Sequence, residues 1–346
     1  MSANWLRMIK CGDHMIHGNV ELYNVAELLP TENNVGKYLC RIPNNLRVTL
    51  NPAAEANALC AAGSEIRFNL EDKTAKVTLS SDIPGLAEVF QGSFHASWHI
   101  IGPQPTEMGV SLPENIKFLE AVAKEKGLPY DPRLTRIILP IYSPIRLISI
   151  EGETTPPRSS QTPSSKYLAY GSSITHGASA MRPTGSYTMR TAQRLGVDLI
   201  NLGFGGGAHC EGQMADYIAE RKDWNFASLE MGINMVGGFS TEEFTERVEY
   251  FVKRITKAHP SKWVFAIDLF TFAGDYDRNS KKQNEFRQAV KETVENLDLP
   301  RLVYVDGRRM LKAASGLTFD LVHPAPGGME EISTNLASLI KRKMGN

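Results

Sequence analysis

KYLAYGSSITHG, residues 166–177, decides the fold of the second half of the chain. Its first residues form an apolar run that is typical of a buried strand, and the run stops at Gly171, where two serines follow. A serine at the carboxyl end of a parallel strand, where a helix begins, is exposed among backbone N–H donors. Ser172 and Ser173 are therefore candidate nucleophiles, although glycine–serine turns also occur in ordinary loops.

Beyond this stretch, apolar strands alternate with helices. We expect further strands at residues 198–203, 226–232, 263–270 and 302–307. We expect helices near residues 187–195, 213–221, 281–296 and 329–344, and another that opens at Ser240 with a capping box. Near-continuously apolar strands, each followed by a helix, predict an α/β domain over residues 165–346, with a flavodoxin-like five-stranded parallel sheet.

Residues 1–155 follow a different pattern, that of short strands in which apolar and polar residues often alternate. EDKT, residues 71–74, predicts a hairpin turn between two of these strands, and LRVTL, residues 46–50, predicts another strand. The amphipathic stretch 112–127 predicts a helix that lies over the sheet. We expect a jelly-roll-like antiparallel β-sandwich, which the proline- and serine-rich linker 152–165 joins to the α/β domain.

The formal charge is balanced, with 38 Lys and Arg against 38 Asp and Glu. Such a balance argues against broad binding to nucleic acid or to an anionic membrane surface. No apolar run is long enough to span a membrane or to serve as the core of a signal peptide. We expect a soluble, cytoplasmic protein whose partner is a small molecule, and we leave homo-oligomerisation open.

We expect neither a metal nor a cofactor. Cys11, His14 and His17 lie close together in the sequence, but no fourth metal ligand is evident. DYDRN, residues 275–279, begins like a calcium loop but lacks the glycine and the glutamate that such a loop needs further on. The four cysteines do not have the spacing of a disulfide scaffold, so we expect reduced, buried thiols.

Residues at other strand ends and just before the last helix supply the partners that a serine nucleophile needs. A serine hydroxyl reacts when an imidazole takes its proton, and the imidazole needs a carboxylate that fixes its tautomer. Ser173, His323 and Asp320 supply these three roles, since the topology brings them to one rim of the sheet. The N–H groups of Ser173 and Gly206 and the side-chain amide of Asn234 could form an oxyanion hole for a tetrahedral acyl intermediate.

These segments resemble the SGNH or GDSL-type esterases and acylhydrolases, and the resemblance covers the whole second half. GSSITHG is similar to the first block of the family, which implies Ser173 as nucleophile and N–H donor. The glycine run NLGFGGGAH is similar to the second block, which implies Gly206. GIN is similar to the third block, which implies Asn234 as side-chain donor, and DLVH is similar to the last, which implies Asp320 and His323.

The chain departs from the family at two positions, because Ser172 and Met235 stand where aspartates are usual. The resemblance favours Ser173 over Ser172 as the nucleophile, since the family places the nucleophile directly before an aliphatic residue and a hydroxyl residue.

The amino-terminal half is similar to the sandwich of the SsfX3-like subgroup, whose namesake is linked to acyl transfer. In that layout the sandwich packs beside the catalytic rim, where His95, Trp98 and His99 could reach the pocket. The alternative is that Trp98 belongs to the sandwich core.

We expect a serine esterase that cleaves short-chain esters, above all acetyl esters, of a carbohydrate or a similar polar alcohol through an acyl-enzyme. The short acyl group is expected because the sequence offers no apolar lid or interfacial helix for lipid substrates. Acyl transfer to a hydroxyl acceptor is the main alternative, and a non-catalytic carbohydrate-binding protein is a further one.

A dinucleotide site is a rival interpretation of the glycine run. Gly203, Gly205 and Ala208 satisfy the G-x-G-x-x-A pattern, and Glu230 ends the next strand, where a ribose-binding acid would lie. This interpretation leaves the GSSIT and DLVHP segments without a role. His176 is a rival base, which we expect instead to line the pocket or lie on the surface, and His209 either borders the acyl pocket or is solvated.

Overall fold

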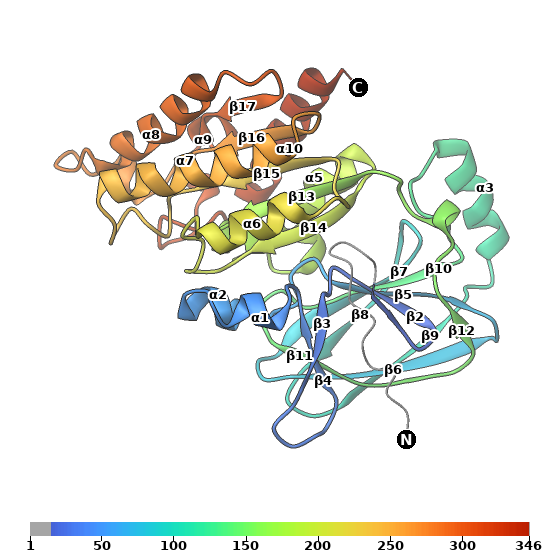
Figure 1. Ribbon diagram of the computed structural model, residues 1–346. Coiled ribbons are helices and arrows are strands. Elements are labelled where there is room, and N and C mark those ends of the chain that lie inside the picture. Colours follow the sequence, from blue (N-terminus) through green and yellow to red (C-terminus); the bar gives the residue numbers. More distant parts are fainter. Residues whose placement is uncertain (1–14, 346) are drawn as a thin grey trace.

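The computed structural model describes residues 15–345, which form an antiparallel sandwich joined to a three-layer α/β part. In Figure 1 the sandwich, coloured blue to green, lies below the α/β part, coloured yellow-green to red. This arrangement confirms the predicted fold class. The proposed division into domains at residues 155 and 165 stays a prediction.

The α/β part is built on one parallel sheet of five strands in the order β14-β13-β15-β16-β17. Its strands are β13 (Lys166–Gly171), β14 (Asp198–Gly203), β15 (Phe226–Glu230), β16 (Trp263–Ile267) and β17 (Leu302–Val305). All four pairings are parallel, which gives the predicted flavodoxin-like order and brings the carboxyl ends of the strands to one rim.

Helices cover both faces of this sheet. Tyr167 and Ala169 of β13 pack with the helices of one face, whereas Leu168 and Tyr170 pack with those of the other, as the alternation of side chains along a strand requires. The first face carries α5 (Tyr187–Leu195) and α10 (Pro326–Met344), and the second carries α6 (Gly212–Glu220), α7 (Thr241–Ala258) and α8 (Lys282–Leu297). Two short helices, α4 (Ser173–His176) and α9 (Gly307–Met310), follow strands at the rim.

The sandwich consists of two antiparallel sheets around a separate apolar core. One sheet contains β1 (Met15–His17), β2 (Val20–Tyr23), β5 (Glu65–Leu70), β7 (Gly85–Gln91), β8 (Phe94–Ile101), β10 (Leu134–Ile138) and β12 (Thr154–Thr155). The other contains β3 (Glu27–Pro30), β4 (Lys37–Cys40), β6 (Thr74–Ser81), β9 (Thr106–Ser111) and β11 (Ile145–Glu151). Since β5 and β6 belong to different sheets, the hairpin predicted at residues 71–74 is wrong: this turn crosses the sandwich.

Two further differences concern helices of the sandwich. The predicted strand 46–50 is wrong, because α1 (Asn44–Arg47) begins just before it and a turn follows. Next comes α2 (Pro52–Asn57), whose N-cap Asn51 accepts two backbone N–H groups, and Figure 1 shows α1 and α2 against the α/β part. The helix predicted within residues 112–127 is present as α3 (Ile116–Lys126).

Buried charged groups join the two parts. Arg67 of β5 forms two hydrogen bonds with Asp198 at the start of β14, at 3.1 and 2.7 Å, and Tyr130 donates to the same carboxylate. Glu65 pairs with both Arg67 and Arg136. Arg41, which is 1% exposed, donates to backbone carbonyls of β14. The sandwich therefore packs directly on the strand that leads to the glycine run.

None of the helices that the structure describes is long and apolar enough to cross a membrane. Cys40, Cys60 and Cys210 are buried free thiols, as expected. Cys11 and His14 lie outside the described residues.

Candidate active site

The turn after β13 is tightly packed around the candidate nucleophile. Ser172 is the N-cap of α4, and Ser173 is the first residue of that helix. A Cβ at position 171 would lie 2.3 Å from Thr175 Oγ1 and 2.5 Å from Glu230 Oε2, so Gly171 is the residue that fits. The strand-to-helix turn thereby presents Ser173 at the rim while Ser172 is buried.

Three predicted residues meet at this rim. His323 Nε2 lies 2.8 Å from Ser173 Oγ, and His323 Nδ1 lies 2.7 Å from Asp320 Oδ2. The other oxygen of Asp320 accepts from the Thr318 hydroxyl and from the N–H groups of Val322 and His323, at 2.7 to 2.9 Å. Although partial burial opposes ionisation, these hydrogen bonds hold the pKa of Asp320 well below its ordinary value. An ionised carboxylate is thus positioned to orient the imidazole.

Glu230 forms a buried polar cluster beneath the nucleophile turn, which the sequence did not predict. Its Oε2 accepts from the N–H and the hydroxyl of Ser172, both at 2.7 Å, and from Thr175 Oγ1 at 3.1 Å. Thr175 Oγ1 is also 2.6 Å from the hydroxyl of Tyr187. Burial raises the pKa of Glu230, and the bonds from Ser172 oppose that rise. Ser172 is therefore bound to Glu230 rather than to His323.

The three predicted donors line one pocket with the nucleophile. Gly206 has a left-handed backbone with φ of 70°, which favours glycine, and neighbours Ser173 and Asn234 in the lining. Asn234 Oδ1 accepts the Ala208 N–H at 3.2 Å, so its NH₂ group remains available to face the pocket. The pocket has a volume of about 650 Å³, and its lining is Asn57, Tyr142, Ser173, Gly205, Gly206, Ile233, Asn234, Val236, Gly237, Phe272, Val322 and His323.

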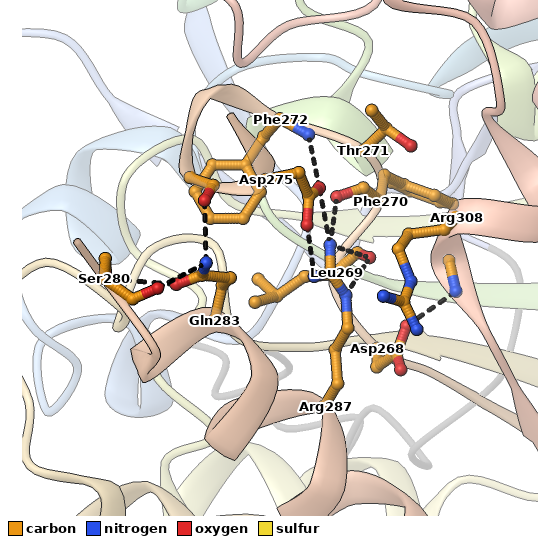
Figure 2. Close-up of polar contacts among 12 residues, drawn as sticks. Asp268, Leu269, Phe270, Thr271, Phe272, Asp275, Ser280, Gln283, Arg287 and Arg308 are labelled. Atoms are coloured by element: carbon orange, nitrogen blue, oxygen red, sulfur yellow. Dashed lines mark hydrogen bonds and ion pairs between the residues drawn. The ribbon is translucent and has the colours of Figure 1, made fainter. Parts of the chain in front are cut away.

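The loop after β16 supports both the pocket wall and the histidine turn. Figure 2 shows Arg287 pointing into this loop, where it binds Asp275 at 2.5 and 2.9 Å and two backbone carbonyls at 3.1 to 3.2 Å. The Ala273 N–H donates to the Leu321 carbonyl at 2.6 Å, and Phe272 contributes to the pocket. Leu321, between Asp320 and the histidine, has a left-handed φ of 56°. The loop thus holds a turn that the backbone alone would not favour.

Neither the rival base His176 nor His209 is hydrogen-bonded to Ser173. His176 is 1% exposed, its Nε2 binds the Ile141 carbonyl at 2.8 Å, and its ring stacks on Tyr142 at 5.0 Å between centroids. Burial lowers the pKa of His176 to about 3, so it is a neutral, buried side chain rather than a pocket or surface residue. His209 is half-buried against Phe239 and outside the pocket lining.

The aromatic segment of the sandwich does not reach the site. Trp98 is 61% exposed on strand β8, so its expected place in the sandwich core is wrong. His95, Trp98 and His99 are all absent from the pocket lining. Asn57 and Tyr142 instead bring the sandwich to the pocket, and only the position of their segments in three dimensions reveals this.

Close packing explains why glycine stands at two positions of the glycine run, without any bound dinucleotide. A Cβ at Gly203 would lie 2.3 Å from the His176 backbone nitrogen, and one at Gly207 would lie 2.4 Å from the backbone nitrogen of Ala54 in α2. Glu230, the supposed ribose ligand, is bound beneath the nucleophile turn. Within residues 15–345, no cluster of three or more metal-ligating side chains is found.

Comparison with known protein families finds a match over part of the chain. Residues 165–341, just over half of the chain, match the family described as GDSL-like lipase/acylhydrolase. No curated protein matches the sequence.

Solved structures share the fold. The salicylyl-acyltransferase SsfX3 from a tetracycline biosynthetic pathway has a TM-score of 0.78 at 18% identity, covering 96% of both chains. A family two carbohydrate esterase from Clostridium thermocellum has a TM-score of 0.62 at 14% identity, covering 83% of this chain and 94% of that chain. An acetyl xylan esterase from Butyrivibrio proteoclasticus has a TM-score of 0.53 at 12% identity, covering 82% of this chain and 90% of that chain.

Proposed function

Because the chain belongs to the GDSL-like lipase/acylhydrolase family, we propose that it is a serine carboxylic-ester hydrolase with Ser173, His323 and Asp320 as its catalytic residues. The observation that carries the proposal is the continuous chain of contacts from Ser173 Oγ through both ring nitrogens of His323 to Asp320, at 2.8 and 2.7 Å. This is the arrangement in which an imidazole can take the serine proton and a carboxylate can stabilise the resulting imidazolium.

The reaction proceeds by double displacement. Ser173 Oγ attacks the ester carbonyl carbon while its proton moves to His323 Nε2, and the carbonyl oxygen becomes negative. The N–H groups of Ser173 and Gly206 and the Asn234 amide donate to that oxygen. The carbon–oxygen bond to the alcohol then breaks, and His323 returns the proton to the departing alcohol. Water, activated by the same imidazole, hydrolyses the acyl-enzyme.

A short acyl group on a polar alcohol is the substrate class that we propose. The pocket of about 650 Å³ combines the polar groups of Ser173, Asn234 and His323 with an apolar wall of Ile233, Val236, Phe272 and Val322. Tyr142 is 43% exposed and presents a flat ring beside the nucleophile, and such rings stack well on the apolar faces of sugars. The names of the structural neighbours, two of which are carbohydrate esterases, support the same class.

Acyl transfer to a hydroxyl acceptor is the second candidate. The salicylyl-acyltransferase aligns with 96% of this chain, including the sandwich, which favours this candidate. Transfer and hydrolysis use the same acyl-enzyme and differ only in whether an alcohol or water attacks it.

A fluorophosphonate probe tests the catalytic assignment, because it labels an activated serine. We expect the native protein to be labelled, Ser173→Ala to lose the label and Ser172→Ala to keep it. Labelling that persists in Ser173→Ala would refute the assignment of the nucleophile.

A substrate panel tests the proposed class. Acetylated sugars and p-nitrophenyl esters of increasing chain length, with and without acceptor alcohols, should show the highest kcat/KM for acetate. Faster release of butyrate or octanoate would contradict the short acyl group, and an acylated alcohol formed at the expense of free acid would favour transfer.

A further inference from the structure

Side chains of the sandwich hold every second carbonyl of the glycine run. Arg41 Nη2 donates to the Gly203 carbonyl at 2.8 Å. The side-chain NH₂ of Asn57 donates to the Gly205 carbonyl at 3.0 Å, and that of Asn51 donates to the Gly207 carbonyl at 2.9 Å. All three donors come from the segment that contains β4 and α2, far from the glycines in sequence. The path of the backbone at the candidate oxyanion hole is therefore fixed by the sandwich.

The contact of Asn57 acts on the peptide group that carries the Gly206 N–H. No cis peptide bond is present in the described residues, so the Gly205 carbonyl and the Gly206 N–H belong to one trans unit and point in opposite directions. Because the carbonyl points towards Asn57 in α2, the N–H points away from that side chain. Gly205, Gly206, Asn57 and Ser173 all line the same pocket, where the acyl oxygen would lie.

Sterics alone would not hold this peptide in one orientation. Residues 205–207 are all glycine, and glycine populates left- and right-handed conformations with similar ease. Asn57 is itself anchored, since its side-chain NH₂ also donates to the Ala53 carbonyl at 2.8 Å and its backbone carbonyl accepts from Arg41 at 2.8 Å. A rigid carboxamide on a helix thus restrains a flexible glycine peptide.

We infer that Asn57 is a positioning residue for the oxyanion hole: it orients the 205–206 peptide so that the Gly206 N–H donates to the developing oxyanion. This inference rests on the proposed esterase function. It also gives the sandwich a role in catalysis, because the donor that fixes the hole comes from outside the α/β part. The serine and the histidine remain in place without Asn57, so its loss should weaken stabilisation of the transition state rather than activation of the nucleophile.

Two variants and a matched control test the inference in the full-length protein. Asn57→Leu keeps the branching and the number of side-chain heavy atoms, Asn57→Ala truncates the side chain at Cβ, and both lose the donor. The control is Asn24→Gly, because Asn24 also donates across the two parts, to the Asn201 carbonyl at 3.2 Å, but away from the pocket. Glycine suits the left-handed φ of 55° at position 24.

Hydrolysis of p-nitrophenyl acetate and inhibition by an arylboronic acid, which forms a tetrahedral adduct with serine, are the readouts. We expect kcat to fall roughly ten- to hundredfold in both Asn57 variants, with KM changed less than about twofold and the boronate Ki raised in parallel. Asn24→Gly should retain native kcat and Ki even if its melting temperature falls as far as that of the Asn57 variants.

Native kcat and Ki in folded Asn57→Leu would overturn the inference, as would equal losses of activity in Asn57→Leu and Asn24→Gly. A native protein that neither hydrolyses the ester nor reacts with fluorophosphonate would overturn the proposed function instead.

Discussion

Ser172 and Ser173 are adjacent and chemically identical, but their surroundings give them different roles. The Ser172 hydroxyl donates to the buried Glu230 carboxylate and accepts the Ile174 N–H at 3.1 Å. The Ser173 hydroxyl lies at the rim beside His323. Where the family usually has an aspartate, this chain has Ser172, which binds the carboxylate of Glu230 at the end of β15, a neighbour of β13 in the sheet. The carboxyl group near the nucleophile turn is therefore supplied from a different position.

The contact between Ser172 and Glu230 predicts how a double mutant of these two residues should behave. Ser172→Asp alone should destabilise the protein by about 3 kcal/mol, because two buried carboxylates in contact cannot both ionise. Ser172→Asp combined with Glu230→Gln should recover much of that loss, since the carboxylamide can donate to the new aspartate. Urea unfolding of the native protein, both single mutants and the double mutant gives the coupling energy. Additive effects would contradict a direct contact of the two positions.

The sequence predicted the positions of Ser173, Asp320 and His323 because Ser173 follows a strand of a parallel sheet and the other two stand just before the last helix, at the same rim. It did not predict the contact of Glu230 with Ser172, although Glu230 was recognised as a strand end. Nor did it predict Asn57, because the hydrogen bond to Gly205 joins residues 148 positions apart and from different parts of the chain. Side-chain contacts of this kind follow from packing rather than from local pattern.

At the scale of the element, α2 shows how a local signal was missed. Residues 46–50 alternate apolar and polar side chains, and this alternation suggested a strand. The next residues, NPAAEAN, have an asparagine cap, a proline in the first turn and three alanines, which together favour a helix. α1 and α2 occupy this region, and α2 carries Asn57 to the glycine run. The preference for a helix start outweighed a short alternating pattern.

The loop after β16 is an element whose stability depends on one buried cation. We expect Arg287→Met to lower the free energy of unfolding by about 3 kcal/mol, because Asp275 loses its partner and two carbonyls lose their donors. Because the same loop holds Leu321, kcat should also fall roughly tenfold through displacement of the histidine turn. Urea midpoints and ester hydrolysis measure the two effects.

Arg254→Met is the matched control for this prediction. Arg254 pairs with Asp216 at 2.6 Å on the exposed surface of α7, where ion pairs contribute little. Its variant should keep both the urea midpoint and kcat close to native. Native kcat in a destabilised Arg287→Met would show that the loop supports folding but not the position of His323.

At the scale of the whole molecule, buried side-chain contacts fix the position of the sandwich relative to the α/β part. Three buried side chains of the sandwich, Arg41, Arg67 and Tyr130, bind groups of β14, the strand that leads to the oxyanion hole. The sequence predicted two parts and their order, but a pair such as Arg67 and Asp198 has no local signature. The interface thus combines structural support with placement of a catalytic peptide, so damage to the contacts that reach the glycine run should affect stability and activity together.

The Glu65 carboxylate at this interface predicts how stability depends on pH. Burial opposes its ionisation, yet Arg136 and Arg67 lower its pKa to about 2, below the ordinary value of 4.5. A folded-state pKa below that of the unfolded chain means that the unfolded state binds the proton more readily. The stabilisation is therefore fully present above about pH 4.5 and is lost as the pH falls towards 2, a change on the order of 3 kcal/mol.

Glu65→Gln isolates this contribution. The variant should be less stable than the native protein at pH 7, because Arg67 and Arg136 lose a charged partner in a buried site. Below about pH 4.5 the difference in unfolding free energy between the two proteins should shrink steadily, since protonation removes the same charge from the native protein. Urea unfolding from pH 7 to the lowest pH at which both fold measures this difference. A constant difference across that range would show that Glu65 contributes through its shape and neutral hydrogen bonds rather than through its charge.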